Sequence, residues 1–237
     1  MNASRVSVPL RRGVSPTSFV VKRAGSIQIG PMPLTAKTIS AFTCASRSCS
    51  AVAVQPAALE LLSALAPVLG RWGRWYVFGA QAVIAYGVPR LSADVDVTLA
   101  LAPDDPERFA RDMESAGFAL RVTDPDFVRR TSVMPFVHLA TAMPLDVVLA
   151  QSGLEDEFLG RAHVVDIGGT AVPLIDLADL IIAKILAGRS KDLDDATALW
   201  RLHGRALDAR SIRRTLALLE QALAQSDLVS AFDAVMR

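Results

Sequence analysis

Residues 93–101 limit the possible fold of this chain more than any other segment. Within them acidic or polar residues alternate with apolar ones, in the order Asp94, Val95, Asp96, Val97, Thr98, Leu99. Successive side chains of a strand point to opposite faces, so this period predicts a β-strand. One of its faces would pack into a hydrophobic core, and the other would carry two neighbouring carboxylates.

The remainder of the chain predicts a sheet surrounded by helices. Helical periodicity indicates helices at 56–69, 80–86, 103–116 and 155–160. Further strands are expected at 74–78, 118–123, 133–140, 145–149, 163–167 and 170–174. From residue 176 onward only helices are expected, at 176–188, 191–203 and finally 207–225. The fold class is therefore expected to be α/β (α+β), a mixed sheet with flanking helices and a C-terminal helical region.

Charge divides the 237-residue chain into two unlike parts. Residues 1–55 contain seven basic side chains and no acid, which leaves 18 basic and 24 acidic residues in 56–237. The first part is rich in Ser, Thr and Pro and is expected to be a disordered extension or an artefact of a start codon placed too far upstream. A transit peptide and a basic arm that contacts nucleic acid are the alternatives. We therefore expect three parts, 1–55, 56–175 and 176–237.

Composition also excludes several classes of protein. With 51% hydrophobic residues the chain is not wholly disordered, and two cysteines cannot build a disulfide scaffold. Cys44 and Cys49 are expected to be free thiols rather than metal ligands. The apolar run 180–186 is interrupted by Lys184, so no membrane span is expected and the protein is predicted to be cytoplasmic.

The paired aspartates suggest a metal site. Asp94 and Asp96 would lie side by side on one face of their strand, where two carboxylates repel each other unless a cation lies between them. Oxygen ligands of this kind suit Mg²⁺ or Mn²⁺. The alternative is an edge strand with one face in solvent.

Two further residues extend this pattern. Gly79 ends a predicted strand just before a helix, where backbone amides could approach a phosphate. Asp146 interrupts a later apolar strand, and its burial would be costly without a cation or hydrogen bonds. A glycine turn, a paired acidic strand and a third acid form the layout of a two-metal phosphoryl-transfer site. The alternative for Asp146 is a strand-start position turned toward solvent.

The run 77–97, which contains Gly79, Asp94 and Asp96, resembles the active-site segment of the nucleotidyltransferase superfamily with the DNA polymerase β-like fold. More narrowly, it is similar to the AbiEii-type nucleotidyltransferases of bacterial toxin–antitoxin and phage-abortive systems. Asp146 matches the third acid of that family, and 56–175 would be the catalytic domain. Ala80 departs from the pattern, since the family has Gly or Ser there, and Ala80 can offer a phosphate only its backbone N–H.

A second stretch is similar to the helical basic motif of the same family. It contains Lys184, Arg189, Lys191, Asp192 and Asp195. The resemblance implies that these residues bind the nucleotide, with the basic ones contacting the triphosphate. Two alternatives are that the Lys184 ammonium reaches water along the helix edge and that Asp192 caps a helix.

The resemblance implies a Mg²⁺-dependent (or Mn²⁺-dependent) transfer of NMP from an NTP to an RNA (tRNA) or protein hydroxyl. Asp94, Asp96 and Asp146 would hold the metal and act in catalysis, and Gly79 and Ala80 would join the basic motif in binding the nucleotide. The protein would be the toxin of a toxin–antitoxin or phage-defence system, with a cognate antitoxin protein as partner. The alternative is a catalytically weak nucleotide sensor or interaction partner in such a system.

Overall fold

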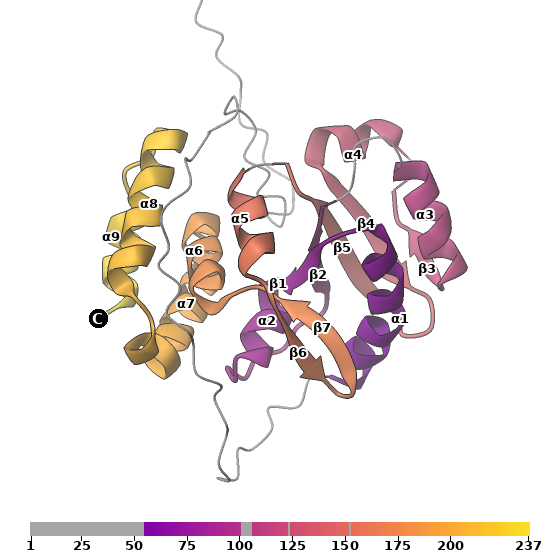
Figure 1. Cartoon of the computed structure of the whole chain (residues 1–237), viewed down its shortest axis with the longest axis horizontal. Coiled ribbons are helices and arrows are strands. Elements are labelled where there is room, and N and C mark those ends of the chain that lie inside the picture. Colours follow the sequence, from indigo (N-terminus) through magenta and orange to yellow (C-terminus); the bar gives the residue numbers. More distant parts are fainter. Residues whose placement is uncertain (1–54, 101–105, 123, 152) are drawn as a thin grey trace, which may run out of the picture.

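The computed structural model describes residues 55–100, 106–122, 124–151 and 153–237. A single mixed sheet of seven strands organises this part of the chain, in the order β3-β4-β5-β2-β1-β7-β6 (Figure 1). The strands are β1 Trp75–Phe78, β2 Val95–Leu99, β3 Phe118–Leu120, β4 Val133–His138, β5 Met143–Leu149, β6 His163–Ile167 and β7 Thr170–Leu174. Two neighbouring pairs, β2 with β5 and β1 with β7, are parallel, and the other pairs are antiparallel.

Helices cover the sheet and extend beyond it on one side. They are α1 Pro56–Trp72, α2 Gly79–Ala85, α3 Pro106–Ser115, α4 Pro125–Thr131, α5 Gly153–Arg161, α6 Leu177–Ala187, α7 Ser190–His203, α8 Ala209–Leu223 and α9 Leu228–Val235, with a short 3₁₀ turn at Gly204–Ala206. Figure 1 shows α6 to α9 grouped together beside the sheet, with α5 between this group and the strands. None of the helices in the described ranges is both long enough and apolar enough to cross a membrane.

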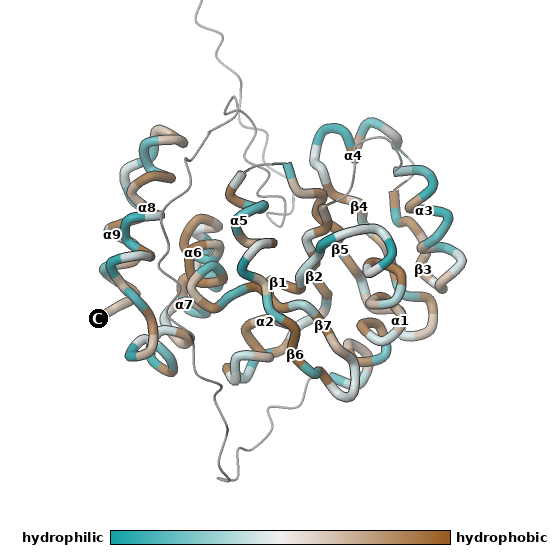
Figure 2. Tube along the Cα trace, viewed as in Figure 1, coloured by the Kyte–Doolittle hydropathy of each residue, from teal (hydrophilic) through white to brown (hydrophobic). Residues whose placement is uncertain are grey.

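The hydrophobic core explains why these segments take up these positions. The apolar stripe of α1, with Leu61, Leu65 and Leu69 fully buried, shares one cluster with the valines that alternate with the aspartates of β2. Spacings of four residues place the α1 leucines on a single helix face. Figure 2 shows apolar residues concentrated along the central strands and polar ones on the outer helices α3 and α4. The opposite face of β2 is left to carry the polar side chains.

The predicted fold class is confirmed: a mixed α/β structure with C-terminal helices. The hairpin β6–β7 has the predicted bounds, because Gly168 and Gly169, at φ 62° and 88°, form its turn. The alternative of an edge strand for 93–101 is excluded, because β2 lies in the middle of the sheet. The prediction for residues 1–55, with Cys44 and Cys49, falls outside the described residues except at Gln55.

Two helices were not predicted. Helix α4 has only seven residues and depends on Asp124, whose carboxylate accepts the N–H of Asp126 at its first turn. Helix α9 follows α8 after a left-handed residue, Ala224, at φ 52°. The helix predicted at 207–225 corresponds to α8, which is slightly shorter. It is not the last element of the chain, because α9 follows it.

Candidate functional site

The turn from β1 into α2 packs directly against Asp96. Phe78, the last residue of β1, pairs with Asp96 of β2, and Gly79 then adopts a left-handed φ of 64°. A Cβ atom on Gly79 would lie 2.1 Å from Asp96 Oδ2. Both the backbone angle and this contact therefore require glycine at position 79.

Asp94 is held in place directly before β2. The hydroxyl Oγ of Ser92 lies 2.8 Å from the backbone oxygen of Asp94 and 3.0 Å from its Oδ1. The side-chain amide of Gln81, on α2, donates to the same backbone oxygen at 3.2 Å. The backbone of Asp94 is thus tied to the glycine turn through α2.

Asp96 is a buried carboxylate with one unsatisfied oxygen. Its exposed fraction is 5%, and its Oδ1 atom has no hydrogen-bond partner within the described part of the chain. Burial, followed by the neighbouring charges of Asp94 and Asp146, raises the pKa of Asp96 to about 7. A carboxylate in this position would be stabilised in its charged form by a bound cation.

Asp146 lies beside Asp96 on the neighbouring strand. The two Cα atoms are register partners in the parallel pair β2–β5, so Asp94, Asp96 and Asp146 share one face of the sheet. Arg121 donates from Nη2 to Asp146 Oδ1 at 2.5 Å. Burial raises the pKa of Asp146, and the Arg121 charge opposes this effect. Asp146 is therefore in the middle of a strand and ion-paired, not at a strand start facing solvent as the alternative held.

Lys184 lies at the centre of a buried charge network. Its exposed fraction is 6%, and its Nζ donates to Asp192 Oδ1 at 2.9 Å and to Asp195 Oδ2 at 2.7 Å. Arg189 pairs with Asp192, and Arg90 pairs with Asp195. The network joins the loop before β2 to α6 and α7.

This network decides two of the open alternatives. The Lys184 ammonium does not reach water along the helix edge, because two carboxylates hold it inside the protein. Asp192 does not cap α7; burial tends to raise its pKa, but hydrogen bonds from Arg189 and Lys184 outweigh burial and hold that pKa below its usual value.

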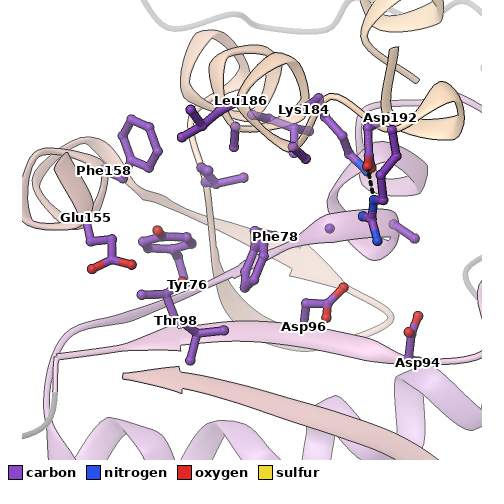
Figure 3. Close-up of a pocket in the computed structure, with 18 of the residues that line it drawn as sticks. Tyr76, Phe78, Asp94, Asp96, Thr98, Glu155, Phe158, Lys184, Leu186 and Asp192 are labelled. Atoms are coloured by element: carbon purple, nitrogen blue, oxygen red, sulfur yellow. Dashed lines mark hydrogen bonds and ion pairs between the residues drawn. The ribbon is translucent and has the colours of Figure 1, made fainter. Parts of the chain in front are cut away.

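A pocket of about 270 Å³ lies between the acidic face of the sheet and helices α5 and α6. Its charged end is lined by Asp94, Asp96, Lys184, Arg189, Lys191 and Asp192, together with Gly79 and Ala80. Figure 3 shows Asp94 and Asp96 below Lys184 and Asp192 at this end, with Phe78 next to them along the sheet. Asp146 and Asp195 do not line the pocket.

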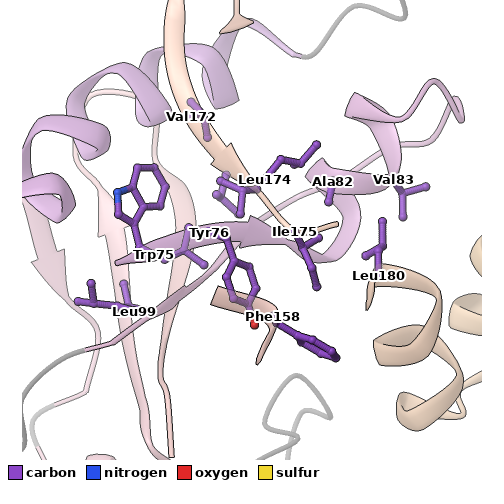
Figure 4. Close-up of a cluster of buried hydrophobic side chains, with 14 of the residues drawn as sticks. Trp75, Tyr76, Ala82, Val83, Leu99, Phe158, Val172, Leu174, Ile175 and Leu180 are labelled. Atoms are coloured by element: carbon purple, nitrogen blue, oxygen red, sulfur yellow. The ribbon is translucent and has the colours of Figure 1, made fainter. Parts of the chain in front are cut away.

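The other end of the pocket is apolar and aromatic. Tyr76, Phe78, Phe158 and Leu186 line it, with Glu155 of α5 beside them (Figure 3). Figure 4 shows that Tyr76 and Phe158 belong to the buried cluster that includes Ile175 and Leu180. Burial strongly raises the pKa of the Tyr76 hydroxyl, so it remains protonated at neutral pH. The pocket therefore connects a charged end to an apolar one.

The carboxylates at the charged end and the neighbouring Asp146 are suitable ligands for a divalent cation, but they are not arranged as a complete metal site. No three His, Cys, Asp or Glu side chains in the described ranges are positioned together as a metal-ligand set. The unpaired oxygen of Asp96 and the oxygen-only donors Asp94 and Asp146 suit Mg²⁺ or Mn²⁺. One oxygen of the Asp146 carboxylate already accepts a hydrogen bond from Arg121.

Sequence patterns missed three of the residues that shape the site. Gln81 reads as an ordinary helix residue. Arg90 lies within the run 77–97 that leads to Asp94, but nothing in the sequence indicates its partner, and Arg121 gives no signal. Arg90 and Arg121 contact acids 105 and 25 residues away along the chain, so only the fold brings these pairs together.

Comparisons with known proteins found similar solved structures but no similar sequences. No protein-family model matches the sequence, and no curated protein sequence matches it either. The crystal structure of ANT(2")-Ia in complex with adenylyl-2"-tobramycin is 14% identical, with a TM-score of 0.46, over 75% of this chain and 97% of that one. A nucleotidyltransferase-like protein from Paracoccidioides brasiliensis is 16% identical, with a TM-score of 0.47, over 77% and 94%.

A third structure, a putative nucleotidyltransferase from H. pylori, is 14% identical, with a TM-score of 0.41, over 77% of this chain and 96% of that one. All three TM-scores are below 0.5, and likenesses this distant do not assign a function. The functional argument therefore depends on the site itself.

Proposed function

We propose that this protein is a metal-dependent nucleotidyltransferase that moves NMP from an NTP to an acceptor hydroxyl. The observation that carries the proposal is the placement of Asp94, Asp96 and Asp146 on one face at the centre of the sheet. Asp96 is buried, and one of its oxygens has no hydrogen-bond partner among the described residues. Basic residues lie at the same end of the pocket as this acidic face. Phosphoryl transfer needs this combination, because the developing charge on the phosphates must be neutralised and held in place.

Asp94, Asp96 and Asp146 would hold Mg²⁺ or Mn²⁺. When bound, such an ion neutralises charge on the phosphates and makes the attacking hydroxyl more acidic. Gly79 supports this arrangement because the lack of a side chain lets the turn approach Asp96 closely. In this proposal the three aspartates are the catalytic residues.

The triphosphate would lie at the charged end of the pocket. The backbone amides of Gly79 and Ala80 and the side chains of Lys184, Arg189 and Lys191 would bind it. Ala80 contributes no hydroxyl, so the basic side chains would supply most of the phosphate binding.

Asp192 and Asp195 take a different part from the direct nucleotide contact that the motif suggested. Their carboxylates accept hydrogen bonds from Lys184 Nζ, so we propose that they position this ammonium for the phosphates. The nucleobase would occupy the apolar end of the pocket, between Phe78 and Phe158, where flat aromatic surfaces favour a planar ring.

For the acceptor we propose an RNA (tRNA) or protein hydroxyl. We also propose that the protein belongs with the AbiEii-type enzymes as the toxin of a toxin–antitoxin or phage-defence system, with an antitoxin protein as partner. The support for these finer assignments is the resemblance of the run 77–97 and of the basic motif after Lys184.

The test is transfer of label from each α-labelled NTP, with Mg²⁺, to total tRNA or total protein. We expect transfer by the unmodified protein, a loss of at least about a hundredfold in Asp94→Ala, and no change in Asp194→Ala, which removes an exposed acid from α7. Binding of NTP without any transfer would favour the nucleotide sensor instead. A protein that neither binds nor transfers nucleotide would contradict the proposal.

A further inference from the structure

The third carboxylate of the candidate metal site already has a cation beside it. Arg121 Nη2 lies 2.5 Å from Asp146 Oδ1, and the two side chains are 38% and 19% exposed. Asp94 and Asp96 have no comparable ion pair among the described residues. The cation therefore lies specifically at Asp146, the acid that does not line the pocket.

The register of the sheet explains how Arg121 reaches this position. Arg121 follows β3 directly, and its N–H donates to the oxygen of Pro135 on β4 at 2.8 Å. Pro135 is the register partner of Asp146, which is the register partner of Asp96, which in turn pairs with Phe78. Arg121 thus lies at one end of a row of residues that crosses four neighbouring strands, β4, β5, β2 and β1.

This row sets the distance that Arg121 must span. Neighbouring strands are about 4.8 Å apart, so Arg121 and Asp146 lie about two strand spacings from each other, with Pro135 between them. Proline places only a short ring on this row. The long arginine side chain can therefore cross over Pro135 and reach the carboxylate.

We infer that Arg121 is a resident counterion of Asp146, with which a divalent cation must compete for this carboxylate. This inference rests on the proposed function, since it takes the three aspartates as the metal site. Arg121 then lowers the affinity of the site for metal and keeps Asp146 neutralised while no metal is bound.

Two other roles for Arg121 make different predictions. If Arg121 only orients Asp146 for the metal, its removal should weaken metal binding. If Arg121 acts only through the overall charge of the protein, removal of another exposed arginine should have the same effect. Arg130 on α4 serves as the control for charge, because it pairs with Asp124 at 2.7 Å rather than with Asp146.

The experiment is titration of the nucleotide-free full chain with Mn²⁺ alone, with free Mn²⁺ followed by electron paramagnetic resonance. We expect Arg121→Ala to bind Mn²⁺ roughly three- to tenfold more tightly than the unmodified protein, as expected for loss of one half-exposed, charge-assisted pair. Arg130→Ala should change the affinity by less than about twofold. In an Asp146→Asn background, Arg121→Ala should have no further effect. Thermal unfolding of each variant shows that it is folded.

The results separate the two proposals. Unchanged or weaker Mn²⁺ binding by Arg121→Ala, or an undiminished effect of this substitution in Asp146→Asn, overturns the counterion role. If Mn²⁺ binding by the unmodified protein still depends on Asp94 in that case, the proposed function stands. If the unmodified protein binds no Mn²⁺, or binds it equally well as Asp94→Ala, both proposals fail.

Discussion

Replacing Asp96 with asparagine is expected to stabilise the metal-free protein at neutral and alkaline pH, although Asp96 is the most buried of the three proposed metal ligands. Folding raises the pKa of Asp96 from 3.8 to about 7, first because the carboxyl is buried and then because Asp94 and Asp146 lie near it. Its Oδ1 has no hydrogen-bond partner among the described residues. The folded protein therefore holds a carboxylate that would be more stable in water.

The direction and size of the effect follow from this shift. Between pH 3.8 and about 7 the unfolded chain has released this proton while the folded protein retains it, so the free energy of unfolding falls as pH rises. A shift of about three pH units, at 1.36 kcal/mol per unit, corresponds to a loss of about 4 kcal/mol once the pH exceeds 7. An asparagine never becomes charged, but its amide adds a buried donor that costs about 1–2 kcal/mol. The expected net effect is a stabilisation of about 2–3 kcal/mol near pH 8 and a destabilisation of about 1–2 kcal/mol near pH 4, where only the cost of the amide remains.

Urea denaturation in the presence of EDTA, from about pH 4 to about pH 8, measures this difference. The stability of Asp96→Asn relative to the unmodified protein should rise up to about pH 7 and then stay level. Above pH 7, Mg²⁺ should reduce this advantage by stabilising only the unmodified protein. Asp194→Asn, which changes an exposed acid on α7, should show no such trend. A gap that is absent, or that does not change with pH, would refute the reasoning.

Two further substitutions test the geometry. Gly79→Ala should lower the free energy of unfolding by about 2–4 kcal/mol, because an alanine at φ 64° is strained. It should also abolish label transfer, because its Cβ would displace Asp96. An unchanged urea midpoint together with full transfer would contradict this expectation. Lys184→Met should cost about 3 kcal/mol or more, because Asp192 and Asp195 would lose the ammonium between them. A thermal midpoint equal to that of the unmodified protein would show that Arg90 and Arg189 suffice.

Much of the fold could be predicted because its local signals are strong. The helix at the start of the described chain has regular leucine spacing, and the strands of the sheet show either alternation or short β-branched runs between turn residues. Helix α4 has no such signal, since it is short and carries charged residues along its length. Strand order could not be predicted, because parallel pairing of β2 with β5 is set by packing between distant segments.

The candidate site also has residues that the sequence identifies and contacts that it does not. Asp94 and Asp96 could be identified from a two-residue period, and Lys184 from its place in an apolar helix. The register that sets Asp146 beside Asp96 could not be predicted, and neither could the arginines that neutralise Asp146 and Asp195. Sequence spacing identifies candidate groups, whereas their pairing depends on the tertiary fold.

The buried Lys184 ammonium between α6 and α7 has a consequence for truncated forms of the protein. All three aspartates of the acidic face precede residue 150, so a truncated chain that ends after the sheet would retain every proposed metal ligand. It would lack Lys184 and Asp195, and Arg90 would lose the acid that holds its loop against α7. Expressing the sheet-bearing half by itself is therefore not expected to yield a minimal enzyme, whereas supplying the missing helices as a separate chain could restore one.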